Sequence, residues 1–418
     1  MKSELVQKAY EIAKERYAAM GVDTEKVLEQ MQDFHLSLHC WQADDVKGFE
    51  VQAGELTGGI QATGNYPGAA RNIDELRADI VKAKSYIPGT HRLNLHEIYG
   101  DFKGKVVDRD EVTPEYFESW IEWAKENNMK LDFNSTSFSH PKSGNLSLAN
   151  PDEGIRNFWI EHTKRCREIS EAMGKAQGDP CIMNLWVHDG SKDQTVNKYL
   201  YRSLLKDSLD KIFATKYDNM KDCIESKVFG IGLESFTVGS NDFYTAYAAQ
   251  NNKLITLDTG HFHPTESVAD KVSAMLLYVP ELMLHVSRPI RWDSDHVTIM
   301  DDPTLDLFQE IVRAGALDRV HYGLDYFDAS INRIGAYVIG SRAAQKCMLR
   351  ALLEPLATLR KYEAEGKGFE RLALLEEEKA MPWQAVYDEF CLRNSVPVGE
   401  EFIADVEKYE AEVTSKRA

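Results

Sequence analysis

The sequence lacks any close pairing of cysteines. Its six cysteines are spread over 418 residues, and no two of them are spaced as CxxC. A zinc ribbon and a disulfide framework both depend on closely spaced or paired thiols, so the spacing argues against both. We expect most of the six to behave as small buried apolar residues.

Long apolar segments and an excess of positive charge are also missing. No stretch approaches the roughly 20 apolar residues of a membrane-spanning helix. The first residues carry Glu4, Lys8, Glu11 and Lys14 where a signal peptide would have its apolar core. Lysine and arginine number 49 against 67 acidic residues, and the net charge of −18 disfavours nucleic-acid phosphates and anionic membranes. We therefore expect a cytoplasmic protein that acts on a small neutral solute.

The sequence does contain a long alternation of strand patterns with helical patterns. From Phe34 to Leu38, apolar and polar residues alternate as in a strand with one buried face. The eight strand candidates are residues 34–41, 91–98, 130–138, 181–190, 222–227, 253–261, 282–288 and 319–328. Helical segments such as 150–173 and 304–315 separate most of them. This order predicts an α/β fold, a (β/α)₈ TIM barrel, for which an open doubly wound sheet is the alternative.

Helical patterns also flank the barrel pattern. Residues 1 to about 30 read as one charged amphipathic helix, so residues 1–330 are assigned to a barrel with an N-terminal helix. Residues 331–418 have helical periodicity and no strong strand candidate, which predicts a C-terminal helical extension. Its apolar faces must be buried against the barrel or against another subunit, so we expect oligomer contacts there.

Glycine and proline mark two further boundaries. The glycine-rich segment 54–72 is expected to form a loop, and residues 73–87 a helix. Thr113 is a candidate N-cap, because Pro114 suits the first turn of a helix that continues to Ala124.

Ionisable residues gather where the last four predicted strands end. The catalytic groups of a barrel lie at the C-terminal ends of its strands, so these positions are the candidates for a site. They are Glu225 and Lys227 after the fifth strand, Asp258 and His261 after the sixth, His285 with Asp293 and Asp295 at the seventh, and Asp325 at the eighth.

Five of these residues are carboxylates, and their convergence in one cavity would be too costly without positive charge. Two divalent cations together with Lys227 would balance the five negative charges. Neutral imidazoles from His261 and His285 would complete the site. A shell rich in carboxylates with a minority of histidine suits Mn²⁺ or Mg²⁺.

The spacing of the acidic residues supports this interpretation. In an extended chain Asp293 and Asp295 project to the same side, so both can hold one cation. Asp258 and His261 can serve one cation or two neighbouring ones. Single DxD motifs and single histidines are common without a metal, and only their conjunction over four strand ends favours a site.

Three nearby residues receive a lesser role. His263 and Glu266 are expected to be supporting or surface groups. Glu234 is a rival to Glu225, which is preferred because it ends a strand and is followed by Lys227.

Three classes of function fit a two-metal barrel. Phosphodiester hydrolysis is one, but an acidic chain without a basic groove suits nucleic acid poorly. Aldose–ketose isomerisation is the second, because cations can hold neighbouring sugar oxygens and polarise their carbon–oxygen bonds. A non-catalytic sugar-binding protein is the third, although a binder gains little from carboxylates that cost stability when the metal is absent.

Seven longer stretches carry a more specific signal. They are "HCWQADDV", "GGIQATGNYPG", "RLNLHEIY", "GHFHPTE", "HVSRPIRWDSDHV", "GLDYFDASINRI" and "LLEEEKAMPWQAVY". These stretches resemble the L-rhamnose isomerase family, which is similar to the xylose isomerase-like barrels, and they run over almost the whole chain. The resemblance implies a cytoplasmic homotetramer that requires Mn²⁺, with two divalent cations per subunit, and that converts L-rhamnose to L-rhamnulose.

The resemblance also implies roles for individual residues. The metal ligands it implies are His261, Asp293 and Asp295 for the catalytic cation, and Glu225, Asp258, His285 and Asp325 for a more structural one. Lys227, His96 and Asp325 are the implied catalytic residues, and Trp186, His96 and Lys227 are the implied sugar contacts. The implied mechanism is a hydride shift from C2 to C1, with proton transfer through an enediol as the rival. Trp41 and His39 either contact the sugar or only pack.

Overall fold

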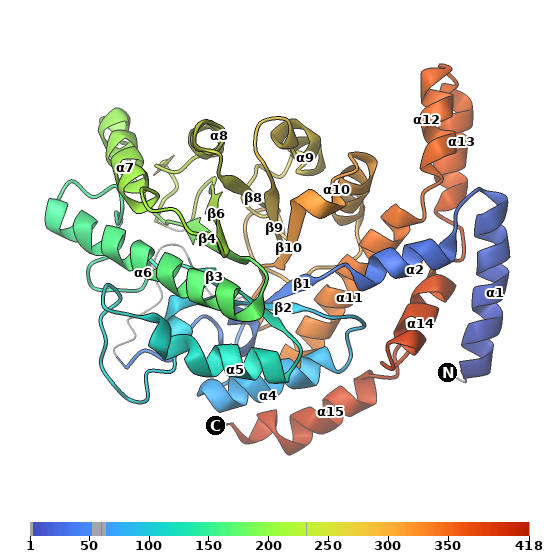
Figure 1. Ribbon diagram of the computed structural model, residues 1–418, viewed down its shortest axis with the longest axis horizontal. Coiled ribbons are helices and arrows are strands. Elements are labelled where there is room, and N and C mark those ends of the chain that lie inside the picture. The colour runs from blue at the N-terminus through green and yellow to red at the C-terminus, as the bar shows by residue number, and fades with distance from the viewer. Residues whose placement is uncertain (1–2, 52–59, 61–63, 231, 418) are drawn as a thin grey trace.

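Eight parallel strands close into a barrel at the centre of the molecule (Figure 1). The computed structural model describes residues 3–51, 60, 64–230 and 232–417. The strands follow one another around the barrel in chain order, and the last pairs with the first. They are β1 (Leu36–His39), β2 (Arg92–His96), β3 (Lys130–Asn134), β4 (Cys181–Trp186), β6 (Met220–Glu225), β8 (Leu254–Asp258), β9 (Leu282–Val286) and β10 (Val320–Leu324). The closed order confirms the predicted TIM barrel and excludes the open doubly wound sheet.

Every predicted strand coincides with an observed one. The predicted segments mostly run past the C-terminal end of the strand, because the polar residues there continue the alternation into the loop. Two further short strands, β5 (Gly190–Ser191) and β7 (Phe236–Thr237), pair antiparallel in the loops after β4 and β6.

Helices surround the barrel and extend beyond it on one side (Figure 1). The helices are α1 (Ser3–Ala19), α2 (Thr24–Gln32), α3 (Trp41–Asp44), α4 (Ile73–Lys84), α5 (Glu118–Glu126), α6 (Glu153–Gln177), α7 (Lys198–Ile212), α8 (Asn241–Asn251), α9 (Ala269–Leu276), α10 (Asp302–Arg313), α11 (Arg333–Leu352), α12 (Leu356–Ala364), α13 (Gly368–Glu378), α14 (Trp383–Arg393) and α15 (Ile403–Glu412). None of those that the structure describes is long and apolar enough to cross a membrane.

The N-terminal segment differs from its prediction. It forms two helices, α1 and α2, and the expectation of one continuous helix is wrong. Gly21 adopts φ +80°, a left-handed conformation that ends α1, and Asp23 then caps α2 by accepting the backbone N–H groups of Glu25 and Lys26. The two signals lie within three residues of each other, and the amphipathic pattern continues across them.

The other two boundaries are confirmed with one change. Residues 64–72 of the glycine-rich segment contain no helix or strand, while residues 54–59 and 61–63 lie outside the described part of the chain. The helix expected at Pro114 begins with a 3₁₀ turn, Pro114–Phe117, before α5, and the Thr113 side chain makes no capping hydrogen bond.

From Arg333 to the end of the described residues the chain is helical. Helix α11 contacts α10, α4 and β1, while α14 packs on α1. The last described residue, Arg417, donates to both carboxylate oxygens of buried Asp79 on α4, at 2.5 and 2.8 Å. Helices α12 and α13 form a hairpin that stands clear of the barrel at the upper right of Figure 1. The boundary between barrel and extension at residue 331 stays a prediction.

All six cysteines are buried and free, as expected from their spacing. Burial raises the pKa of each thiol above its ordinary value. The cysteines therefore fill space in the core and bind no partner sulfur.

Candidate metal centre and active site

The C-terminal ends of four neighbouring strands bring the candidate residues together. In the register of the barrel, Asp258 pairs with His285, and Gly323 of β10 pairs with His285 from the other side. Glu225 is the last residue of β6, and Asp325 follows directly after β10. One side chain from each of four strands thus points to the same end of the barrel.

Two groups of these side chains place their donor atoms within 4.8 Å of one another. The first group is Glu225, Asp258, His285 and Asp325, and the second is Asp258, His261 and Asp293. Asp258 belongs to both groups. The structure therefore joins six of the seven predicted ligands into two adjoining clusters.

The first group is centred on His285. Its Nδ1 lies 3.2 Å from Glu225 Oε1 and 3.2 Å from Asp325 Oδ2. Asn184, in the middle of β4, donates to the other oxygen of Glu225 at 2.5 Å and accepts from Thr256 at 2.7 Å. The Glu225 carboxylate is thus held from inside the barrel.

The predicted lysine lies beside the second group. Lys227 Nζ lies 2.5 Å from Asp293 Oδ2 and 3.3 Å from His261 Nε2. His261 Nε2 also lies 3.1 Å from Asp293 Oδ2 and 3.9 Å from Asp258 Oδ2. One ammonium group therefore faces a carboxylate and an imidazole at hydrogen-bonding distance.

Asp295 lines the same cavity and belongs to neither group. Its backbone has φ +47°, a left-handed conformation that interrupts the extended chain assumed for this segment. The segment is therefore not fully extended, although Asp293 and Asp295 both line the same cavity.

The pKa values of the five carboxylates at the site are shifted in two directions: two are raised and three are lowered. Burial and the neighbouring carboxylates raise the pKa of Asp258 and of Asp295 well above the ordinary value. Burial also acts on Glu225, but the imidazoles of His285 and His261 lower its pKa below the usual range. Among the described residues, only some of these carboxylates find a compensating charge.

The donor chemistry fits a divalent cation. Asp258 Oδ2, Asp293 Oδ1 and His285 Nε2 are buried, and no described residue forms a hydrogen bond with them. Buried polar atoms are rarely left so, and carboxylate oxygens and imidazole nitrogens are common ligands of divalent cations.

The cavity beside these groups has an aromatic wall. Trp41 stacks on His96 at 4.2 Å between ring centroids, and the Lys227 ammonium lies 5.0 Å from the centre of the Trp186 ring. Burial lowers the pKa of His96 well below its ordinary value, so its imidazole is neutral. The residues that line this cavity are Trp41, Ile60, His96, Asn134, Asn184, Trp186, Glu225, Lys227, His261, His285, Asp293, Asp295, Asp325 and Phe327.

Three residues with a lesser predicted role lie away from the cluster. His263 and Glu266 are exposed, and Glu266 pairs with Lys271 at 2.7 Å. Glu234 is exposed as well, which favours Glu225 as the member of the cluster.

Sequence reasoning missed several members of the site. Asn184 is a polar residue within the otherwise apolar strand β4, and Asn134 is a polar residue at the end of β3; both are signals that the sequence offered. Phe327 and Ile60 look like ordinary apolar residues in the sequence. His39, left open between two roles, lies with Nε2 2.9 Å from Asp325 Oδ1.

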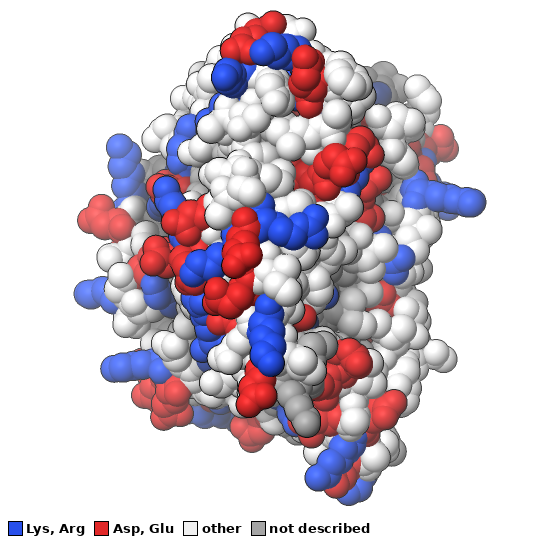
Figure 2. All heavy atoms as spheres, turned by 90° about the vertical axis from the view of Figure 1, so that its right-hand side faces the viewer, with Lys and Arg blue, Asp and Glu red and all other residues white. Residues whose placement is uncertain are grey.

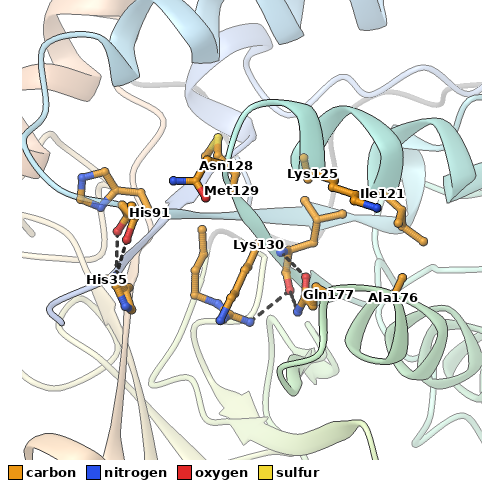
Figure 3. A pocket seen from close by; sticks show the side chains of 13 residues that line it. His35, His91, Ile121, Lys125, Asn128, Met129, Lys130, Ala176 and Gln177 are labelled. Carbon is orange, nitrogen blue, oxygen red and sulfur yellow. Dashed lines mark hydrogen bonds between the residues drawn. The ribbon is translucent and has the colours of Figure 1, made fainter. Parts of the chain in front are cut away.

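A separate hollow of about 330 Å³ opens at the other end of the barrel, at the N-terminal ends of β1, β2 and β3 (Figure 3). Two of its basic side chains are already paired: Arg92 contacts Asp132 at 2.8 Å, and Lys130 contacts Asp179 at 3.1 Å. Residues at this end of a TIM barrel generally serve stability, whereas active sites, like the candidate centre here, lie at the opposite end.

The fold and the site define a class of protein: a closed parallel barrel with a candidate divalent-metal centre at the C-terminal ends of its strands. The sequence model of the L-rhamnose isomerase family (RhaA) matches residues 4–417. The chain therefore belongs to the L-rhamnose isomerase family.

Individual relatives agree with this assignment. A Bacteroides thetaiotaomicron protein named L-rhamnose isomerase is 84% identical, with 100% of each chain covered. A Mannheimia succiniciproducens protein of the same name is 55% identical, with 99% of each chain covered. Among solved structures, D-psicose 3-epimerase from Clostridium cellulolyticum H10 aligns with a TM-score of 0.44 and 13% identity, over 78% of this chain and 99% of that one.

A buried histidine behind the site gives a pH prediction. Burial, together with the charge of Arg109, lowers the pKa of His162 to about 3. An unfolded histidine titrates near 6.5, so the stability that neutral His162 contributes is present above about pH 6.5 and is lost as the pH falls toward about 3. The stability advantage of wild type over His162→Gln should therefore shrink between about pH 7 and pH 4. Urea unfolding in the presence of a chelator measures it.

The control for this experiment is His263→Gln, at an exposed side chain. Its stability should follow the wild-type pH profile. A constant difference between wild type and His162→Gln over the same range would contradict the prediction.

Proposed function

We propose that this chain isomerises L-rhamnose to L-rhamnulose with two divalent cations, Mn²⁺ by preference. The observation that carries the proposal is the pair of donor groups that share Asp258 beside Lys227, in a chain of the L-rhamnose isomerase family. Two cations held side by side suit neighbouring sugar oxygens.

The proposed ligands divide between the two cations. His261, Asp293 and Asp295 would hold the catalytic cation, and Glu225, Asp258, His285 and Asp325 the structural one. Asp258 would hold the structural cation and also has a donor atom close to the ligands of the catalytic one. Bound there, the cations supply Lewis acidity that polarises the O1 and O2 bonds of the open-chain sugar.

The side chains around the cations position the sugar and stabilise charge. Lys227 holds a positive charge beside O1, where negative charge develops, because Asp293 and other carboxylates raise its pKa against the effect of burial. Neutral His96 bonds Thr136 through Nδ1 at 3.2 Å, which leaves Nε2 for a sugar hydroxyl. Trp186 provides an apolar face for the carbon chain, and Asp325 is fixed by His39 and His285.

Two other functions are less well supported. A phosphodiesterase would need basic residues gathered for its substrate, whereas Lys and Arg are interspersed with Asp and Glu on the face shown in Figure 2. A sugar-binding protein without activity would bind the sugar without turnover. An isomerase of another aldose remains an alternative, since single hydroxyl groups decide such specificity.

Activity should depend on the metal and on Glu225. Ketose formation from L-rhamnose should cease after exhaustive chelation and return with Mn²⁺. Glu225→Gln should lower kcat/KM by about a hundredfold or more, because metal ligands and their supporting groups have effects of that size. Glu234→Gln, at the exposed rival position, is the matched control and should retain full activity. Full turnover in chelator would contradict the two-metal proposal.

The route of hydrogen transfer is tested in deuterated water. We propose that hydrogen moves from C2 to C1 as a hydride while O2 loses its proton and O1 takes one up, so that the carbonyl passes from C1 to C2. Lys227 would stabilise the negative charge on O1, and bound cations would add to this stabilisation. A hydride shift carries the C2 hydrogen directly, so the product should contain almost no solvent deuterium by mass spectrometry. Substantial deuterium at C1 would establish the enediol route instead.

Assembly as a homotetramer is supported by the C-terminal helices. Phe369 and Leu372 on α13 are 82% and 61% exposed, on a hairpin that stands clear of the barrel. Apolar residues in such a position favour burial against another subunit. We propose that residues 331–418 provide these contacts. A cytoplasmic location is a separate proposal, which the family resemblance supports.

Sedimentation should give four times the chain mass of 47.5 kDa. The double substitution Phe369→Asp and Leu372→Asp should shift the protein to smaller species, because it places charge in an apolar contact. Val196→Asp, at a side chain that is 95% exposed elsewhere, is the control. A monomeric wild type would refute the tetramer.

A further inference from the structure

Arg109 is a buried arginine outside the candidate metal centre. It lies in the loop between β2 and α5, and its side chain is 2% exposed. Nη1 donates to the backbone oxygens of Thr136 and Phe138, at 2.7 and 2.6 Å. Nε and Nη2 donate to the two oxygens of Glu50, each at 2.9 Å. The planar guanidinium thus joins three separate parts of the chain.

The turn that Arg109 holds carries part of the cavity wall on its inner side. Thr136 Oγ1 lies 3.2 Å from Nδ1 of His96. The Phe138 ring meets the rings of Trp41 and Trp186 edge-on, both at 5.7 Å between centroids. His96, Trp41 and Trp186 all line the cavity, so a shift of this turn moves each of them.

The outer side of the turn is held by His162 as well. Nε2 of His162 accepts the backbone N–H of Thr136 at 3.0 Å, and its Nδ1 lies 3.1 Å from the backbone oxygen of Arg109. A neutral imidazole can satisfy both contacts, one as acceptor and one as donor. The backbone N–H and C=O of Thr136 are therefore both fixed by groups behind the cavity.

Two carboxylates lie near Arg109, and the geometry selects Glu50 as its counterion. Glu97 Oε2 is 3.7 Å from Arg109 Nε, and neither Glu97 oxygen forms a hydrogen bond with a described residue. Burial and the charge of Glu50 raise the pKa of Glu97 well above its usual range, which favours the neutral acid. Glu50 alone makes the two-point contact that an arginine fork requires.

We propose that Arg109, paired with Glu50, is a positioning residue for sugar binding, which it supports by fixing the Thr136–Phe138 turn behind His96, Trp41 and Trp186. This proposal depends on the proposed function, because it takes from it that His96 and Trp186 contact the sugar. Lysine cannot replace arginine here, because a single ammonium cannot reach two backbone oxygens and both carboxylate oxygens at once. Small displacements of groups that hold a substrate have large effects on its binding and reaction.

A matched arginine separates positioning from simple stabilisation. Arg167 on α6 is 1% exposed and donates to both oxygens of Asp222, at 2.7 and 3.0 Å. It also donates to the backbone oxygens of Ile212 and Thr215, at 2.6 and 2.7 Å. Like Arg109, it thus holds one carboxylate by two points and two backbone oxygens, but none of these partners lines the candidate site.

The experiment compares Arg109→Lys with Arg167→Lys in the Mn²⁺-loaded enzyme. Both substitutions should lower the thermal unfolding midpoint, because each loses buried hydrogen bonds. Only Arg109→Lys should raise KM for L-rhamnose, by about tenfold, and alter the tryptophan band of the near-ultraviolet circular dichroism. Glu50→Gln should give a smaller change in the same direction, and it carries the test if Arg109→Lys does not fold.

Two results separate this inference from the proposed function. If wild type turns over L-rhamnose and the KM of both Arg109→Lys and Glu50→Gln stays within about twofold of it, the positioning role is overturned and the isomerase stands. If wild type has no activity on L-rhamnose, the proposed function fails. The tryptophan band then decides the positioning of the wall: an unchanged band in both variants overturns it, and a change in Arg109→Lys but not in Arg167→Lys supports it.

Discussion

Repulsion among buried carboxylates is the constraint on which this site depends. Five acidic side chains converge at the C-terminal end of the barrel, within reach of three imidazoles and one ammonium group. Without further positive charge, some of the carboxylates must take up protons. The raised pKa values of Asp258 and Asp295 agree with this. The surrounding barrel must be rigid enough to hold these side chains together. Binding of a cation would offset the free energy that their burial costs.

The two ends of the barrel differ in whether their charged and polar side chains have partners. At the N-terminal end, acidic residues are neutralised by permanent partners: Arg92 with Asp132, Arg167 with Asp222, and Lys221 with Glu281. At the C-terminal end, carboxylate oxygens and an imidazole nitrogen are left without a hydrogen-bonding partner among the described residues. The charges at the N-terminal end are thereby neutralised within the chain, whereas donor atoms at the C-terminal end are available to a ligand.

Much of the fold and part of the site could be predicted from the sequence, for reasons that particular residues illustrate. The eight strands show a local alternation of apolar and polar residues, and Glu225, Asp258 and His285 were recognisable because they lie at or next to the ends of strands. The break at Gly21 and the left-handed backbone at Asp295 were not predicted, because the amphipathic pattern runs past one and an extended chain was assumed for the other. The supporting residues Arg109 and His162 act across separations of 26 to 59 residues, which no local pattern encodes.

The burial of all six thiols has a practical consequence for the study of this enzyme. Thiolates react with alkylating reagents, and burial both hides the sulfur atoms and raises their pKa, so the folded chain offers such reagents little to attack. A single cysteine introduced at an exposed side chain, such as Val196 just before α7 or Tyr199 in its first turn, would then be the preferred point of attachment for a dye or spin label. The native cysteines therefore do not have to be replaced before such a label is attached.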